Sequence, residues 1–108
     1  MEKEYMDMEY EYNPIELKDT VDHMISDDWK KRFIAEYAQL ITRIDSIVDL
    51  MWEDEEKIKE IGPLDLIDMQ VEHMNNYKRI LDIRAEIYGI DMDKELEKLQ
   101  KKEKIKKF

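Results

Sequence analysis

Arginine, tyrosine and amide side chains beside apolar stripes are the residues of this sequence best suited to bind a ligand. Tyr77 and Arg84 share a helical face with Ile80 and Ile87, and Arg43 adjoins an earlier apolar repeat. A guanidinium forms paired hydrogen bonds with phosphate, and an aromatic ring stacks on a base. A pocket between helices lined by such groups would suit a nucleotide-like molecule. The candidate ligand-binding residues are Arg43, Tyr77 and Arg84, with Arg79, Gln70 and Asn76 as weaker candidates.

The same arginines have an alternative, structural interpretation. Arg43 and Arg84 could each pair with Asp or Glu across a helix interface and so fix its register. Arg84 separates the two interpretations, because it lies on the apolar stripe with Tyr77 and must either pair internally or face a ligand.

Patterns typical of enzymes and metal sites are missing from the sequence. There is no cysteine, and no Ser or His constellation accompanies the paired carboxylates. Glycine stands only at positions 62 and 89, which excludes a glycine-rich phosphate loop. Neither His23 nor His73 follows a Glu by three positions, as a di-iron helix bundle would require. We therefore expect a non-enzymatic protein with no metal and no cofactor.

The charge of the chain limits its partners. The 28 acidic residues outnumber the 18 basic ones, which gives a formal charge of −10. This charge disfavours binding to duplex nucleic acid and to anionic membranes. No apolar run approaches the length of a membrane span, and the N-terminus lacks the order of a signal peptide. The expected location is the cytoplasm.

The elements that must position these residues are helical. A chain of 108 residues forms one small domain, and 2 Gly and 2 Pro are too few for a turn-rich β-fold. Residues 27–60 predict one long helix, which Gly62 and Pro63 end. It carries Leu40 and Ile44 on its main apolar seam. A second seam comprises Ile34, Ile41, Val48 and Trp52.

Residues 64–88 predict a second long helix, closed by a left-handed Gly89. Its main stripe comprises Ile67, Val71, Met74, Leu81, Ala85 and Tyr88, widened by Ile80, Ile83, Ile87 and Ile90. A short amphipathic piece at 15–25 precedes the hairpin, with Ser26 as the cap of the next helix. After it, Asp91 can cap a third helical stretch.

The predicted fold is all-α: a long antiparallel helical hairpin with short flanking helices. Its predicted divisions are an acidic N-terminal arm (1–13), the hairpin domain (14–90) and a basic C-terminal helix or tail (91–108). Such wide apolar faces are difficult to hide in a 13.3 kDa monomer. We therefore expect self-association, at least as a dimer.

Two segments of the sequence carry a recognisable pattern. The first comprises Glu16-Leu17-Lys18-Asp19-Thr20-Val21, the run from Ser26 to Leu40, and Arg43. The second comprises Leu66, Met69-Gln70, Met74, Tyr77, Ile80-Leu81, Arg84-Ala85-Glu86-Ile87 and Gly89-Ile90. Together they resemble a family of small tailed-phage proteins related to a crAss-like phage protein. The acidic arm, residues 52–60 and the lysine-rich tail depart from the family pattern.

This resemblance implies an accessory protein that acts inside an infected host cell. Small helical phage proteins of this kind are often anti-defence factors, and by analogy some unrelated ones form oligomers that sequester nucleotide immune signals. The leading hypothesis is that the chain sequesters a cyclic nucleotide or an ADP-ribose derivative without catalysis. The alternative is a protein–protein inhibitor or adaptor that acts on a host protein such as a nuclease or a transcription component.

Overall fold

A computed structural model describes residues 15–106 of the chain, with side chains for residues 15–100. The described part is helical and contains no strand, which confirms the all-α prediction. None of its helices is both long enough and apolar enough to cross a membrane. The predicted acidic arm lies outside the described residues. The elements are a 3-10 helix η1 (Leu17–Thr20), α2 (Val21–Met24), α3 (Trp29–Glu53), α4 (Glu55–Ile61), α5 (Leu64–Tyr88) and α6 (Met92–Lys106).

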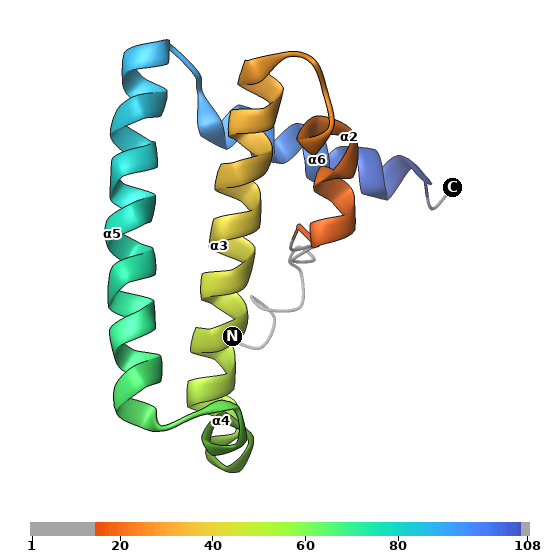
Figure 1. The fold of residues 1–108 in the computed structure, drawn as a ribbon. Coiled ribbons are helices and arrows are strands. Elements are labelled where there is room, and N and C mark those ends of the chain that lie inside the picture. Colours follow the sequence, from red (N-terminus) through yellow and green to blue (C-terminus); the bar gives the residue numbers. More distant parts are fainter. Residues whose placement is uncertain (1–14, 107–108) are drawn as a thin grey trace, which may run out of the picture.

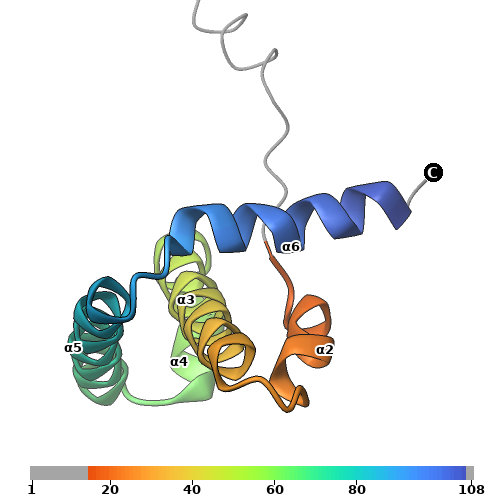
Figure 2. The same ribbon diagram turned by 90° about the horizontal axis from the view of Figure 1, so that it is seen from above.

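The long helix α3 is the centre of the arrangement. It runs antiparallel to α5, with α4 at the turn between them (Figure 1). Viewed from above, α2 lies on the side of α3 away from α5, and α6 runs across one face of the row (Figure 2). Helix α3 packs against η1, α2, α4, α5 and α6, whereas the main contacts of α5 are with α3. The position of α5 therefore depends on a single interface.

Short polar contacts define the ends of the hairpin helices. Asp28, not Ser26, is the N-cap of α3, and its carboxylate accepts a hydrogen bond of 2.9 Å from the Lys30 amide. Ser26 instead accepts a hydrogen bond from the Asp28 amide. At the other end of the hairpin, Gly89 has a φ of 73°, as predicted, and ends α5 in the left-handed conformation.

The prediction of one unbroken helix over 27–60 is wrong. Helix α3 ends at Glu53, and Asp54 adopts extended φ and ψ angles of −145° and 87°. Its carboxylate accepts a hydrogen bond of 3.1 Å from the Lys57 amide and so caps the new helix α4. An aspartate that satisfies the first free amides of a helix stabilises such a restart. The break turns α4 so that Ile58 becomes buried.

The core forms where the predicted seams meet. Leu40 and Ile44 are each 7% exposed, which confirms their assignment to the core. Leu81 and Ala85 face them from α5, and Leu99 of α6 joins the same cluster. The second seam is correct for Ile34, Ile41 and Val48, which are buried or packed against this cluster. It is wrong for Trp52, which is 84% exposed because α3 ends one residue later and α4 turns away.

A polar network crosses from α3 to α5 beside this core. The hydroxyl of buried Tyr37 donates a hydrogen bond of 2.6 Å to Asp82. Lys78 forms an ion pair of 3.1 Å with the other carboxylate oxygen of Asp82. Burial opposes the ionisation of Asp82, but the hydrogen bonds from Tyr37 and Lys78 outweigh it and hold the pKa of Asp82 below its ordinary value of 3.8. The network therefore stabilises the charged form of Asp82 in the folded state.

We predict that Leu40→Ala lowers the free energy of unfolding by about 2 to 5 kcal/mol, because it removes a buried side chain and leaves a cavity. Chemical denaturation followed by circular dichroism measures the change. Ile25→Ala is the control, since Ile25 is exposed and its loss should change the free energy by less than about 0.5 kcal/mol. Equal effects of the two variants would mean that the wrong face of α3 has been assigned to the core.

We also predict that the stability difference between the wild type and Asp82→Asn depends on pH. A carboxylate with a lowered folded-state pKa stabilises the fold above its unfolded-state pKa and loses that contribution as the pH falls through the folded-state value. The wild type should therefore be more stable than Asp82→Asn at neutral pH, and the difference should shrink below about pH 4. Denaturation at a series of pH values measures it.

The control is Asp68→Asn, because Asp68 is exposed and lies two seven-residue steps before Asp82 on the same side of α5. Asp68 has no hydrogen bond or ion pair with another described residue. The predicted role of the network would be contradicted if the stability difference between the wild type and Asp82→Asn stayed constant from neutral pH to below pH 3.

Candidate functional site

The strongest candidate for a ligand-binding group is Arg84, on the side of α5 that faces α3. Its side chain is half-buried. The guanidinium carbon lies 4.9 Å from the centre of the Phe33 ring and 5.3 Å from the centre of the Tyr88 ring. Its Nε donates a hydrogen bond of 2.8 Å to the Tyr88 hydroxyl. These contacts fix the orientation of the guanidinium.

Aromatic rings surround Arg84 on the α3 side. The Tyr88 ring meets the Phe33 ring edge to face, with centres 5.2 Å apart, and meets the Trp29 ring in the same way at 4.9 Å. Phe33 is buried, but Trp29 at the start of α3 is 47% exposed. An exposed indole thus lies in the same cluster as an oriented cation. A planar aromatic group of a ligand can stack on such a surface.

The ion pairs expected in the structural interpretation of the arginines are not formed. Within residues 15–100, neither Arg84 nor Arg43 lies within ion-pair distance of a carboxylate. The terminal nitrogens of Arg84 also have no hydrogen-bond acceptor in that part of the chain. Among these residues, the register of α3 against α5 is held by apolar packing and by the Tyr37–Asp82 and Tyr77–Glu36 hydrogen bonds. No carboxylate of residues 15–100 neutralises the positive charge of Arg84.

Tyr77 lies on the same side of α5 as Arg84, two turns earlier. Its hydroxyl donates a hydrogen bond to the carboxylate of Glu36 on α3. This hydrogen bond raises the pKa of Tyr77 above its ordinary value, with further contributions from burial and the charge of Glu36, whereas the charge of Arg84 lowers it. The structure therefore brings the predicted residues Tyr77 and Arg84 together on one side of the hairpin, and Glu36 joins them.

Arg43 and Gln70 lie further along this side. Glu36 meets Tyr77, and the two helices are antiparallel. One seven-residue step on each helix therefore places Arg43 opposite Gln70, and this pair lies about 10 Å along the hairpin from Glu36 and Tyr77. Arg43 is exposed, and Gln70 donates a weak hydrogen bond of 3.8 Å to the sulfur of Met74. We call the surface formed by Trp29, Phe33, Glu36, Tyr77, Arg84 and Tyr88 the Arg84 face, and Arg43 and Gln70 extend it.

The remaining predicted residues, Asn76 and Arg79, are not part of the Arg84 face. Both are exposed on the outward surface of α5. Arg79 donates a hydrogen bond of 3.3 Å to the side-chain oxygen of Asn76. The six candidates therefore do not line a single pocket between the helices.

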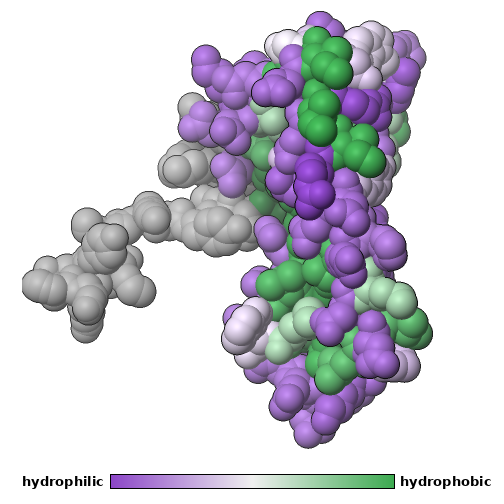
Figure 3. All heavy atoms as spheres, turned by 90° about the vertical axis from the view of Figure 1, so that its left-hand side faces the viewer, coloured by the Kyte–Doolittle hydropathy of each residue, from purple (hydrophilic) through white to green (hydrophobic). Residues whose placement is uncertain are grey.

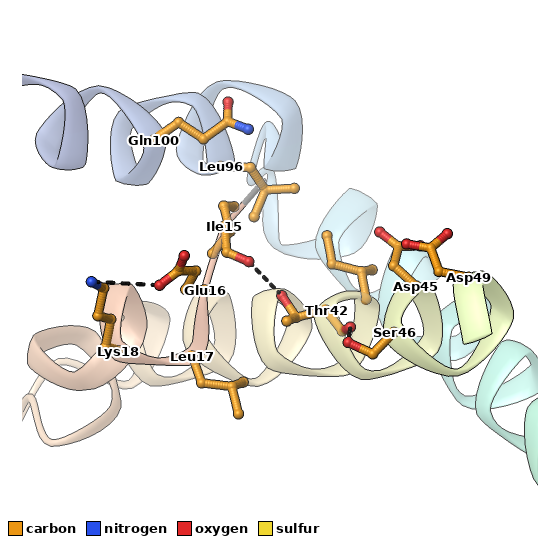
Figure 4. Close-up of a pocket in the computed structure, with 11 residues that line it drawn as sticks. Ile15, Glu16, Leu17, Lys18, Thr42, Asp45, Ser46, Asp49, Leu96 and Gln100 are labelled. Atoms are coloured by element: carbon orange, nitrogen blue, oxygen red, sulfur yellow. Dashed lines mark hydrogen bonds and ion pairs between the residues drawn. The ribbon is translucent and has the colours of Figure 1, made fainter. Parts of the chain in front are cut away.

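Sequence reasoning missed a cavity of about 650 Å³ between η1, α3 and α6. Figure 4 shows Asp45 and Asp49 on α3 at one end of it, with Leu96 and Gln100 contributed by α6. Burial, together with the negative charge of Asp49, raises the pKa of Asp45. The sequence did contain one signal of this cavity, the Asp45–Asp49 pair one helical turn apart beside Ile41. The signal was not sufficient, because the opposite walls of the cavity come from distant segments, η1 and α6.

The two surfaces differ in the charged groups that they present. Among the described residues, the charged groups that line the cavity are Glu16, Lys18, Asp45 and Asp49, and Lys18 forms an ion pair of 3.5 Å with Glu16. Such a surface repels phosphate. In the described part of the chain, no group of three or more His, Asp or Glu side chains is arranged to hold a metal ion. Within residues 15–100, the oriented cation of these two surfaces is Arg84.

Comparison with known proteins gives one finding. No curated protein and no solved structure matches the chain. A protein-family model described as Sequestin matches residues 27–87, which span α3, α4 and nearly all of α5. This region includes Trp29, Phe33, Tyr77 and Arg84, but it excludes the walls of the cavity contributed by η1 and α6. Since the match covers more than half of the 108 residues, the chain belongs to the Sequestin family.

Proposed function

We propose that this protein binds and sequesters a small nucleotide-derived signalling molecule, a cyclic nucleotide or an ADP-ribose derivative, without changing it chemically. The family name suggests a sequestering role. The resemblance to tailed-phage proteins supports an anti-defence setting, in which the protein acts in the cytoplasm of an infected cell. A signal held by the protein would not reach the host effector that it activates.

The observation that carries this proposal is the environment of Arg84. A half-buried guanidinium has lost part of its hydration, and no carboxylate of residues 15–100 compensates for that loss. A phosphate can accept paired hydrogen bonds from the terminal nitrogens. Arg84 is held by Tyr88 and Phe33 before a ligand arrives, so binding requires little further ordering of this side chain.

Neighbouring groups on the Arg84 face suit the other parts of a nucleotide. Trp29 offers an exposed aromatic ring on which a base can stack. The Glu36 carboxylate, already hydrogen-bonded to Tyr77, can accept further hydrogen bonds from ribose hydroxyls or base amino groups. Arg43 and Gln70 would contact a ligand long enough to extend along the hairpin. The arrangement offers no activated nucleophile and supports retention instead of turnover.

The test compares the wild type with Arg84→Ala by isothermal titration and thermal melting against a panel of cyclic nucleotides, cyclic dinucleotides and ADP-ribose derivatives. At least one panel member should bind the wild type and raise its melting temperature, since binding to the native state stabilises it by mass action. Arg84→Ala should abolish that rise. Without ligand, the variant should melt only modestly below the wild type, because it loses the hydrogen bond to Tyr88 and the packing on Phe33 but leaves no carboxylate of residues 15–100 unpaired.

Lys98→Ala is the matched control, because it removes one positive charge from the exposed surface of α6 and should leave binding unchanged. Mass spectrometry of the released ligand should recover it unmodified. The proposal is contradicted if no panel member binds at high micromolar concentration, or if Arg84→Ala binds as tightly as the wild type.

The alternative, an inhibitor or adaptor that occupies a host protein, is favoured by the exposed apolar residues on the outward side of α5. Purification of the tagged protein from host lysate distinguishes the two functions. A stoichiometric host protein would support the alternative, whereas a small molecule released on denaturation would support sequestration.

A further inference from the structure

The outward side of α5 carries a regular stripe that no described part of the chain covers. We call it the outer stripe, and it comprises Leu66, Met69, His73, Asn76, Ile80, Ile83 and Ile87, all of them exposed. Figure 3, which looks onto α5, shows two hydrophobic areas separated by a hydrophilic band. Ile87 is 75% exposed, and Leu66, Ile80 and Ile83 are each more than half exposed. Clustered exposure of large apolar side chains is typical of an interaction surface.

The spacing of the outer stripe is that of a coiled-coil seam. Its members follow one another at alternating steps of three and four residues. The inner side of α5 repeats with the same period through Ile67, Val71, Met74, Lys78, Leu81, Ala85 and Tyr88, and this inner side packs on α3. Helix α5 therefore has two parallel seams, of which α3 covers only one.

We propose that the outer stripe binds the outer stripe of a second copy of this chain, with the two α5 helices antiparallel across a twofold axis. One antiparallel register matches six of the seven members by polarity and leaves Ile87 beyond the start of α5 of the second copy. It sets Leu66 against Ile83 of the second copy and Met69 against Ile80 of the second copy. The two polar members meet at the centre, where His73 faces Asn76 of the second copy. A polar pair at a defined layer fixes the register of such an interface.

The residues that flank the outer stripe favour this orientation. In the antiparallel register, Glu72 lies opposite Arg79 of the second copy on one side of the seam. On the other side, Gln70 lies opposite Tyr77 of the second copy. A parallel arrangement would instead set Arg79 against Arg84 of the second copy, and this like-charge contact is unfavourable. The like-charged pair of the antiparallel register, Asp65 and Glu86, falls at the exposed ends of the seam, where solvent screens it.

The same dimer would add a side chain to each ligand site, and this part of the inference rests on the proposed function. The twofold axis places the Arg84 faces of both copies on the same side of the assembly. Gln70 of the second copy then lies beside Tyr77, so that each Arg84 face gains a polar group from the other chain. The dimer itself does not depend on a ligand and is measured without one.

Sedimentation equilibrium of the full chain at micromolar concentration tests this inference. We expect a mass twice that of the 13.3 kDa chain. Ile80→Asp combined with Ile83→Asp should raise the dissociation constant roughly a hundredfold or more, since it places charge in the apolar layers of the interface. Both side chains are exposed in the protomer, so the helical circular dichroism signal should be retained. A wild-type mass of 13.3 kDa at every concentration would overturn the proposal and leave this face to a different partner.

The orientation is tested by charge exchange and by cross-linking. Glu72→Arg should weaken the dimer, and Glu72→Arg combined with Arg79→Glu should restore it, because the exchanged charges face one another only between antiparallel copies. The chain has no cysteine, so a mixture of Leu66→Cys and Ile83→Cys proteins reports the register directly. A mixed disulfide supports the antiparallel dimer. A disulfide formed by Leu66→Cys protein alone, or failure of the charge exchange to restore the dimer, contradicts it.

Discussion

The packing of the inner side of α5 on α3 is the interaction on which the rest of the structure depends. Helix α3 is surrounded by η1, α2, α4, α5 and α6, whereas α5 is held mainly by this one seam and by the hydrogen bonds of Tyr37 with Asp82 and of Tyr77 with Glu36. Because the described residues cover only one side of α5, its opposite side is exposed in this part of the chain. Between the two sides, the same seam aligns Arg84 with the aromatic residues of α3 and so creates the proposed binding face.

The hairpin could be predicted because its signals are local or periodic. The apolar repeats placed Leu40, Ile44 and Leu81 in the core, and Gly89 marked the end of α5. The break at Asp54 was missed because an aspartate inside an apolar repeat is compatible with an exposed helical position. Its role as a cap depends on the turn that buries Ile58, which is a tertiary effect. The exposure of Trp52 follows from the same break.

The candidate site was less predictable, because the surroundings of a side chain are not encoded in the spacing along one helix. The pattern around Tyr77 and Arg84 identified two residues that lie on one side of the hairpin, but it also selected Asn76 and Arg79, which lie on the outward surface. Trp29 and Phe33 come from α3 and meet Arg84 only through the register of the hairpin. Nor did the spacing reveal that Arg84 has no carboxylate partner in residues 15–100.

The claim that the Arg84 face binds a nucleotide-derived ligand is tested most directly by NMR of the two tryptophan side chains. Trp29 lies in the aromatic cluster of that face, and Trp52 is an internal reference because it lies at the far end of α3 with 84% of its surface exposed. On titration with ADP-ribose or a cyclic dinucleotide, the account predicts that the indole NH signal of Trp29 shifts to saturation while that of Trp52 stays in place. Saturable binding that leaves Trp29 unmoved and instead shifts the backbone amides of Asp45, Asp49 and Leu96 around the acidic cavity would contradict it.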